Sequence, residues 1–169
     1  MPTVTAAARW LRRRADNVVV GLLATMFVTF ILQILFRYLV DQPLGWSEEV
    51  IVTVWLWTVL WGAAFVIGES EEIRFDIVYS NISESWRRAF TVITGVVLII
   101  VYGISLPAAY SYVNFMKVER SAYLHIPINV LYSVYVIFAV ASIVRYGFLV
   151  LRAIKGTPSP RTDPAELRD

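Results

Sequence analysis

The chain has 169 residues, of which 58% are hydrophobic and 17% are charged, whereas soluble domains average about 45–50% apolar and about 25% charged residues. This shift indicates a membrane protein. The absence of cysteine excludes disulfides, thiol catalysis and cysteine-ligated metals. The single histidine, His125, argues against a cytochrome that holds haem through paired histidines, so no cofactor is expected.

Four stretches without charged residues are each long enough to cross a bilayer: residues 18–36, 50–68, 89–112 and 126–144. At about 1.5 Å per residue, roughly 20 apolar residues span the hydrocarbon core of about 30 Å. We therefore predict an all-α integral membrane protein with four transmembrane helices, at residues 18–37, 48–68, 86–112 and 126–148. They form a membrane domain at residues 18–150, which follows a basic segment at 1–17 and precedes a proline-rich tail at 151–169, predicted to be disordered.

The basic segment places Arg12, Arg13 and Arg14 ahead of the first apolar run. That run is too long for a signal peptide and no small-residue cleavage site follows it, so we interpret it as an uncleaved helix. The segment itself is open to two interpretations. Either Trp10 and Leu11 lie in the headgroup layer while the arginines meet anionic phospholipids, or a solvated tail only sets the orientation.

The first span carries a stripe of residues spaced four apart: Gly21, Thr25, Thr29, Gln33 and Arg37. This spacing places them on one slowly drifting helix face. The stripe could line a groove for a partner or a substrate. It could also be a packing seam within the chain's own bundle, because small and hydroxyl residues let membrane helices approach closely. We favour the packing seam.

The second span opens on Trp46, Ser47, Glu48 and Glu49. We predict that Ser47 is the N-cap, which puts both carboxylates in the first turn, at the positive end of the helix dipole. Adjacent helical residues point about 100° apart, so both glutamates cannot face one neighbour. We expect one of them to pair with Arg37 at the end of the first span and the other to face a partner outside this chain.

Three tryptophans follow within the second span. Trp57 and Trp61 are four residues apart and share a face, whereas Trp55 points elsewhere. Trp46 and Trp61 are placed to anchor the span at the two membrane interfaces. The deeper tryptophans suit a lipid-filled groove or a subunit interface, and large aromatics at such depth more often serve packing than cofactor binding.

The connection between the second and third spans is the most polar one. Its charged residues crowd into a short stretch that also holds apolar side chains: Glu69, Glu71, Glu72, Arg74 and Asp76. The stretch is either an amphipathic segment on the membrane surface or a solvated charge cluster. The carboxylate spacing matches no metal-binding pattern such as the calcium loop, so no metal site is expected.

Most of the 15 basic residues fall on one side of the predicted membrane. They precede the first span, separate the second from the third, and follow the fourth: Arg9, Arg12, Arg13, Arg14, Arg74, Arg87, Arg88, Arg145, Arg152, Lys155, Arg161 and Arg168. Because basic segments stay in the cytoplasm, both termini are predicted to be cytoplasmic. The loops near residues 38–48 and 113–125 are then predicted to face outward.

No Asp, Glu, Lys or Arg lies in the middle of a predicted span, which argues against an autonomous proton- or cation-coupled transporter. No nucleophile–base pair is visible, so we do not expect an enzyme. We also expect no nucleic-acid partner. These absences favour a subunit of a larger transport complex. The alternative is a small four-helix transporter that acts as a homodimer, with Thr25, Thr29 and Gln33 lining its path. Uptake by the purified chain alone would discriminate between the subunit and the autonomous transporter.

Several of these elements together resemble the small, Q-type membrane subunit of the tripartite ATP-independent periplasmic, or TRAP, transporters. They are the four helices with cytoplasmic ends, Arg37, the Trp-Ser-Glu-Glu sequence at 46–49, Gly62-Ala63, and the Ile-Arg-Phe-Asp sequence at 73–76. The likeness covers residues 15–155. One position departs from the family, which often has a histidine before the Ile-Arg pair, where this chain has Glu72.

The resemblance implies a non-catalytic subunit of the bacterial inner membrane that binds and braces a large permease subunit. The large subunit would carry an organic acid inward with sodium, after a periplasmic substrate-binding protein delivers it. Candidate residues for the subunit interface or for a tie between helices are Arg37, Trp46, Glu48, Glu49, Trp57, Arg74 and Asp76. Candidate residues for docking the binding protein are Asp41, Lys117, Glu119 and Arg120.

Overall fold

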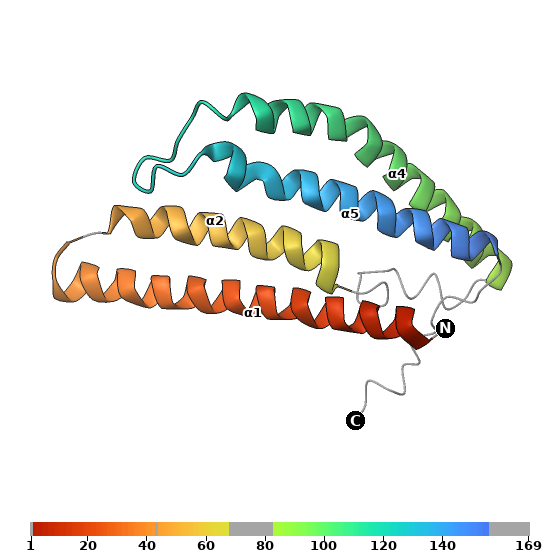
Figure 1. Cartoon of the computed structure of the whole chain (residues 1–169), viewed down its shortest axis with the longest axis horizontal. Coiled ribbons are helices and arrows are strands. Elements are labelled where there is room, and N and C mark those ends of the chain that lie inside the picture. Colours follow the sequence, from red (N-terminus) through yellow and green to blue (C-terminus); the bar gives the residue numbers. More distant parts are fainter. Residues whose placement is uncertain (1, 43, 68–82, 156–169) are drawn as a thin grey trace. The chain divides into compact units, whose positions relative to one another are not determined.

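The computed structural model describes residues 2–42, 44–67 and 83–155. Within them the chain forms four long helices and one π-helical segment (Figure 1). The elements are α1 (Pro2–Leu39), α2 (Gly45–Trp61), the π-helix η1 (Gly62–Val66), α4 (Glu84–Phe115) and α5 (Ile128–Ile154). Four helical stretches in these residues are long and apolar enough to cross a membrane, which confirms the predicted all-α membrane fold.

Helix α1 runs without a break from the basic segment through the first predicted span. Its 38 residues extend for about 57 Å, well beyond the hydrocarbon core of about 30 Å. The helix closes where the N–H groups of Val40 and Gln42 both donate to the Phe36 carbonyl, at 3.2 Å each. Asp41 has φ of 54° there, a left-handed conformation that aspartate tolerates better than most residues.

Helix α2 begins at Gly45, with Leu44 in the N-cap position. The prediction that Ser47 caps this helix is therefore wrong. Ser47 lies inside the first turn, where its hydroxyl donates to the Leu44 carbonyl at 2.6 Å and its side chain is fully buried. At its other end α2 widens into η1, a change of helix type at small residues that the sequence did not predict.

Other helix ends also differ from their predicted positions. Helix α4 extends three residues past the predicted end of the third span at 112. Helix α5 continues to Ile154, so the first residues of the predicted tail are helical. The rest of that tail, from residue 156 on, lies outside the described residues, as does most of the polar connection with Arg74 and Asp76.

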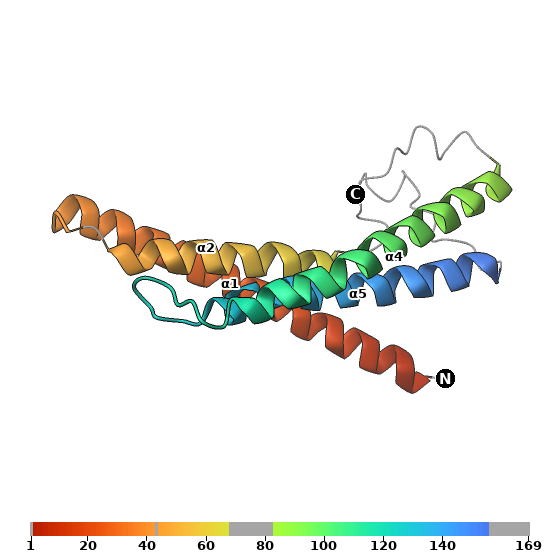
Figure 2. The ribbon, with the colours of Figure 1, turned by 90° about the horizontal axis from the view of Figure 1, so that it is seen from above.

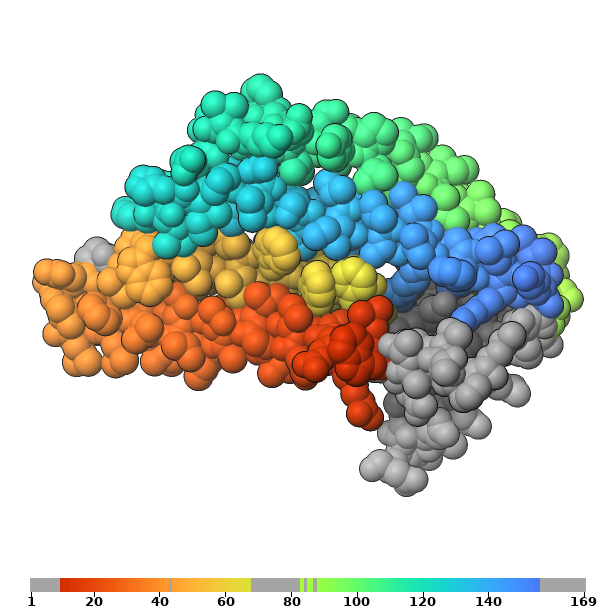
Figure 3. Space-filling model, in the orientation of Figure 1, coloured from red at the N-terminus to blue at the C-terminus, as the bar shows by residue number. Residues whose placement is uncertain are grey.

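The chain separates into two compact units, which we describe in turn. The first unit contains α1, α2, η1, the end of α4 from Pro107 and the start of α5 up to Phe138. In it α1 packs along α2 and η1, as both ribbon views show (Figures 1 and 2). The space-filling view shows the atoms of α1 and α2 in contact along much of their length (Figure 3). Small residues of this unit are buried, among them Ala15 and Ala64.

The second unit contains the earlier part of α4 and the later part of α5. The two helices approach closely at Gly95, which is buried. A Cβ atom at this position would lie 2.5 Å from Cγ2 of Val150 on α5. The missing side chain therefore permits the approach, as small residues commonly do between membrane helices. Ser142 and Leu149 of α5 are also buried in this unit.

Few large side chains are buried in the described part of the chain. The buried hydrophobic residues there are Ala15, Ala64, Val134, Ala139 and Leu149. Large apolar side chains remain exposed on all four long helices, for example Phe27, Trp55, Ile104 and Phe148. In a bilayer such faces contact lipid tails or another subunit. Lipid tails are as apolar as these side chains, so their exposure to lipid carries no hydrophobic penalty.

Candidate functional site

The candidate site lies where the start of α2 meets the loop between α4 and α5, which we call the 116–127 loop. The Glu49 carboxylate accepts two backbone hydrogen bonds from this loop. The N–H of Tyr123 donates to Oε1 at 2.9 Å, and the N–H of Leu124 donates to Oε2 at 3.0 Å. Each carboxylate oxygen thus has its own donor, and hydrogen bonds to a charged acceptor are stronger than neutral ones.

The 116–127 loop has a defined backbone conformation that presents these donors. Arg120 and Pro127 form an isolated antiparallel bridge. The N–H of Ser121 donates to the Ile126 carbonyl at 3.0 Å, and the N–H of Ile126 donates back to the Ser121 hydroxyl at 3.1 Å. His125 closes the turn in the left-handed region, with φ of 53°. The loop is therefore a tight turn whose crest is held by Glu49.

Two further contacts fasten α2 to this part of the first unit. A Cβ atom at Gly45 would meet the ring of Tyr123, so the glycine makes room for the tyrosine. About two helical turns beyond Glu49, the indole Nε1 of Trp57 donates to the Leu131 carbonyl at 3.1 Å. Together with Glu49, these contacts join α2 to the loop and to the first turn of α5.

The arrangement suits a structural role. Both oxygens of Glu49 are occupied by loop N–H groups. Among the described residues, no group of three or more His, Cys, Asp or Glu side chains could hold a metal ion. The chemistry available at this site is therefore that of a positioned, charged acceptor that fixes a loop.

The predicted pairing of Arg37 with a glutamate is not found: in the described residues, Glu49 bonds to the loop and no ion pair joins Arg37 to Glu48 or Glu49. Arg37 and Glu48 are both exposed, whereas Glu49 is half-buried. The physical reason is the competing set of backbone donors. Two N–H groups of the tight turn point at α2 and occupy the carboxylate of Glu49, one of the two glutamates that were candidates for the pairing with Arg37.

The stripe on α1 satisfies much of its polarity internally. The Thr25 hydroxyl donates to the Gly21 carbonyl, and the Thr29 hydroxyl donates to the Thr25 carbonyl, both at 2.8 Å. Thr29 is buried, while Thr25 and Gly21 are exposed and Gln33 is half-buried. Within the stripe, only Thr29 is buried by packing in this chain, and its neighbours in the stripe are exposed or half-buried.

The remaining candidates fall into two groups. The docking candidates of the two loops are all exposed: Asp41, Lys117, Glu119 and Arg120. The guanidinium of Arg120 also donates to the His125 carbonyl at 3.4 Å. Trp46 is 37% exposed beside the buried Ser47. Arg74 and Asp76 lie outside the described residues, so the structure does not place them.

Sequence reasoning missed the partners of Glu49 and Trp57. Those partners are backbone groups of Tyr123, Leu124 and Leu131, and a backbone group carries no signature of residue type. It also missed the hydrogen bond from Arg12 on α1 to the Val66 carbonyl at the end of η1, at 3.3 Å. A cation is favoured at the carbonyl end of a helix, and Arg12 meets the carbonyl end of η1. The sequence alone does not show that these two segments are neighbours.

A comparison with family models identifies one match. The model described as "Tripartite ATP-independent periplasmic transporters, DctQ component" matches residues 7–156, which include α2, α4, α5, the Glu49 site and all but the first five residues of α1. A search of curated proteins found no match. Because the matched region covers most of the chain, the chain belongs to the DctQ-component family and is a small membrane component of a TRAP transporter.

Proposed function

We propose that this chain is the non-catalytic small subunit that binds and braces the large permease subunit of a TRAP transporter. The complete transporter takes up an organic acid together with sodium, after a periplasmic binding protein delivers the substrate. The complex resides in the bacterial inner membrane, with both termini of this chain in the cytoplasm. The family membership supports the assignment to the transporter.

The observation that carries the bracing role is the exposure of large apolar side chains on every long helix. Val52 and Trp55 of α2 are 63% and 55% exposed, and Ile104 of α4 is 74% exposed. The chain offers these faces while its own short core consists mainly of small side chains. Broad apolar faces of this kind are the surfaces through which membrane subunits associate.

The Glu49 site supports a second part of the proposal, that the outward loops help to dock the binding protein. The carboxylate holds the 116–127 loop in one conformation, and the loop displays Lys117, Glu119 and Arg120 on its surface. A preorganised loop loses less conformational entropy on binding. Charges at the rim of an interface mainly raise the association rate and fix the orientation of the partner.

The subunit assignment predicts that the isolated chain does not transport. A tagged chain expressed with its large subunit and binding protein should retain the large subunit during purification. Proteoliposomes that contain the chain alone should show no sodium-dependent uptake of a panel of radiolabelled organic acids, whereas those with the large subunit and the binding protein should take up one of them. Uptake by the chain alone would instead support the homodimeric transporter.

The docking role predicts a charge effect at the outward loop. The double variant Lys117→Glu/Arg120→Glu should slow association of the binding protein by about tenfold at low salt, with a smaller effect at high salt, because electrostatic steering is screened. Surface plasmon resonance on the complete transporter in nanodiscs measures this rate.

The matched control for that experiment is Arg152→Glu, which reverses an exposed charge in the last turn of α5, far along the helix from the 116–127 loop. It should leave the association rate unchanged. Equal rates for the wild type and the double variant at low salt would contradict the docking role without affecting the bracing role.

A further inference from the structure

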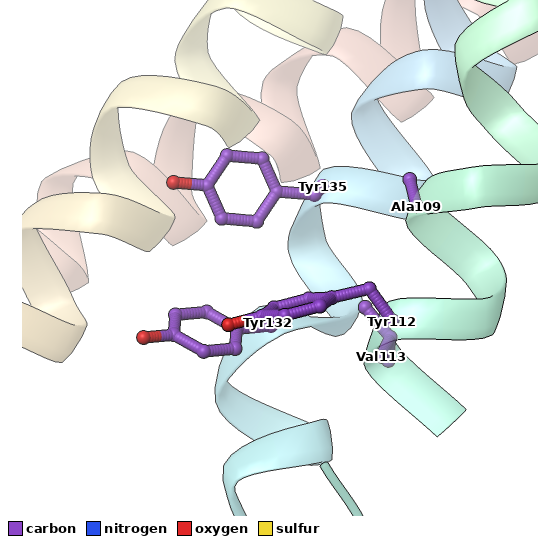
Figure 4. Close-up of a pocket in the computed structure, with 5 residues that line it drawn as sticks. All are labelled: Ala109, Tyr112, Val113, Tyr132 and Tyr135. Carbon is purple, nitrogen blue, oxygen red and sulfur yellow. The ribbon is translucent and has the colours of Figure 1, made fainter. Parts of the chain in front are cut away.

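Two features of the first unit are not used by the function proposed above. One is a groove of about 380 Å³ between the end of α4 and the start of α5, lined by Ala109, Tyr112, Val113, Tyr132 and Tyr135 (Figure 4). The ring centroids of Tyr112 and Tyr132 are 6.3 Å apart, within the range of aromatic contacts, but the lining carries no charge that would select a ligand. The other feature is the basic end of α1, where charge and depth together define a ligand.

The basic end of α1 presents one exposed helix face. Because α1 runs unbroken from Pro2 to Leu39, residues three and four positions apart share a face there. The face carries an aromatic ring, two guanidinium groups and an amide, and all four side chains are exposed: Trp10, Arg13, Arg14 and Asn17. We call these four residues the basic face. The two arginines form its edges, about 100° apart around the helix, with the other two residues between them.

The opposite side of the same helical turns packs within the first unit. Ala15 is buried, and the Arg12 guanidinium donates to the Val66 carbonyl at the end of η1 at 3.3 Å. At about 100° per residue, these two positions lie roughly 140–160° around the helix from Trp10. The packing of α1 on η1 therefore turns the basic face away from the rest of the unit and toward the surroundings.

The hydrogen bond of Arg12 also indicates the depth of the basic face. Val66 is the last residue of the second candidate span, so the Arg12 guanidinium lies where that span leaves the hydrocarbon core. On α1 the apolar run begins at Val18, and Arg14 and Arg13 precede it by four and five residues, about 6–8 Å along the helix. The headgroup layer on each side of the core is roughly 5–8 Å thick. The two arginines therefore lie at the level of the lipid phosphates.

The cations of the basic face keep their hydrogen-bond donors available. Cζ of Arg14 lies 5.2 Å from the centroid of the Trp10 ring. Stacking on a ring uses the flat face of a guanidinium and leaves the N–H groups at its edge free to donate. Among the residues that the structure describes, neither Arg13 nor Arg14 makes a hydrogen bond or an ion pair with a protein group. Asp16, the one acidic residue of the first 20, lies off this face, so the face itself carries two uncompensated positive charges.

Below the cations the same face becomes apolar. It continues toward the middle of the membrane with Gly21, Ala24 and Val28, which are all exposed. A Cβ atom at Gly21 would have nothing within 4 Å, so this part of the helix surface is open. The small side chains at 21 and 24 leave a shallow strip along α1 where an acyl chain can lie. The order along the face is thus cationic at the headgroup level and apolar below it.

We propose that the basic face binds one anionic phospholipid, whose phosphate lies over the middle of the face between Arg13 and Arg14. Both side chains are long enough to reach it from the two edges, and their planar forks match phosphate oxygens. The Asn17 amide, one turn closer to the core, donates to an ester oxygen, and an acyl chain passes over Gly21 and Ala24. An anionic headgroup is favoured because a zwitterionic one brings a further cation close to the two arginines.

The test removes the two charges and keeps the helix. The full-length chain and the variant Arg13→Gln/Arg14→Gln are purified in detergent and titrated with palmitoyl-oleoyl phosphatidylglycerol, and separately with phosphatidylcholine of the same acyl chains. Native mass spectrometry counts the bound lipid. The wild type should bind one phosphatidylglycerol in preference to phosphatidylcholine. The variant should bind phosphatidylglycerol about tenfold more weakly and lose the preference, because the charge-assisted hydrogen bonds are gone.

The matched control removes two positive charges elsewhere. Arg152→Gln/Lys155→Gln changes two exposed residues at the end of α5 and should leave binding of the first phosphatidylglycerol unchanged. Arg13→Lys/Arg14→Lys retains the charge without the planar forks and should bind with intermediate affinity. A phosphatidylglycerol with a photoreactive acyl chain should label residues 21–28 in the wild type and lose this labelling in Arg13→Gln/Arg14→Gln.

Three results would overturn the proposal. The first is equal phosphatidylglycerol affinity in the wild type and Arg13→Gln/Arg14→Gln, with circular dichroism confirming equal helix content. The second is equal weakening by both glutamine pairs, since net charge alone would then attract the lipid. The third is a variant that keeps the lipid but no longer co-purifies with the large subunit, because the arginines would then meet acidic groups of that subunit. The titration uses the chain without its partners, so its outcome is separate from the test of the proposed function.

Discussion

Replacing Glu49 with alanine is expected to release the 116–127 loop from α2. The N–H groups of Tyr123 and Leu124 then lose their shared acceptor, and the loop opens more often. The chain contains no cysteine, so a single cysteine can report on the loop without background. A cysteine in place of the half-buried Ile126 should react with a membrane-impermeant maleimide roughly tenfold faster in the Glu49→Ala chain.

The adjacent glutamate provides the matched control. Glu48 is exposed and has no hydrogen bond to the loop among the described residues, so Glu48→Ala should leave the labelling rate of the cysteine at 126 unchanged. Glu49→Gln should give an intermediate rate, because an amide retains one oxygen acceptor but turns a donor toward the second N–H. Equal labelling rates for Glu48→Ala and Glu49→Ala would show that Glu49 does not hold the loop.

Replacing Gly95 with leucine is expected to destabilise the contact between α4 and α5 in the second unit. The first added atom would lie 2.5 Å from Cγ2 of Val150, and the branched side chain of valine has few alternative rotamers. Overpacking of this kind costs about 1–3 kcal/mol. Thermal unfolding of the purified chain in detergent, followed by circular dichroism, should show a lower midpoint for the variant.

A second glycine of the same helix separates crowding from helix propensity. A Cβ atom at Gly103 would have nothing within 4 Å, so Gly103→Leu should be neutral or stabilising, by up to about 1 kcal/mol from helix propensity. Val150→Ala should restore most of the stability lost in Gly95→Leu, because it removes the clashing methyl group. Additive effects of the two substitutions would indicate that Gly95 and Val150 do not meet in the membrane.

The fold was predictable because its main signal is local. Each spanning helix corresponds to a long apolar run without charges in the sequence. The spacing of Trp57 and Trp61 also places them on one helix face. The family was predictable for a related reason, since its motifs are short sequences such as Trp46 to Glu49. The ends of the helices were less predictable, because α1 continues through the basic segment and α2 ends in a π-helical turn.

The candidate site was predictable only in part. The sequence indicated that Glu48 and Glu49 need separate neighbours, because adjacent helical residues diverge. It did not indicate which neighbours, and the expected pairing of one glutamate with Arg37 is not found among the described residues. The actual donors come from 74 and 75 residues further along the chain and are backbone groups, which any sequence could supply.

The sequence by itself determined that this protein crosses a membrane with four helices and that it belongs to a TRAP transporter, because hydrophobic length and short motifs are properties of contiguous residues. Only the tertiary structure decided what Glu49 holds, why Gly95 carries no side chain and that Tyr112 meets Tyr132. Each of these depends on the contact of two segments that are far apart in the chain, and such contacts follow from helix packing and loop geometry. From the sequence, the Glu49 carboxylate is interpreted as part of a helix start. In the structure, it holds a loop that is distant in the chain by accepting two of its backbone N–H groups.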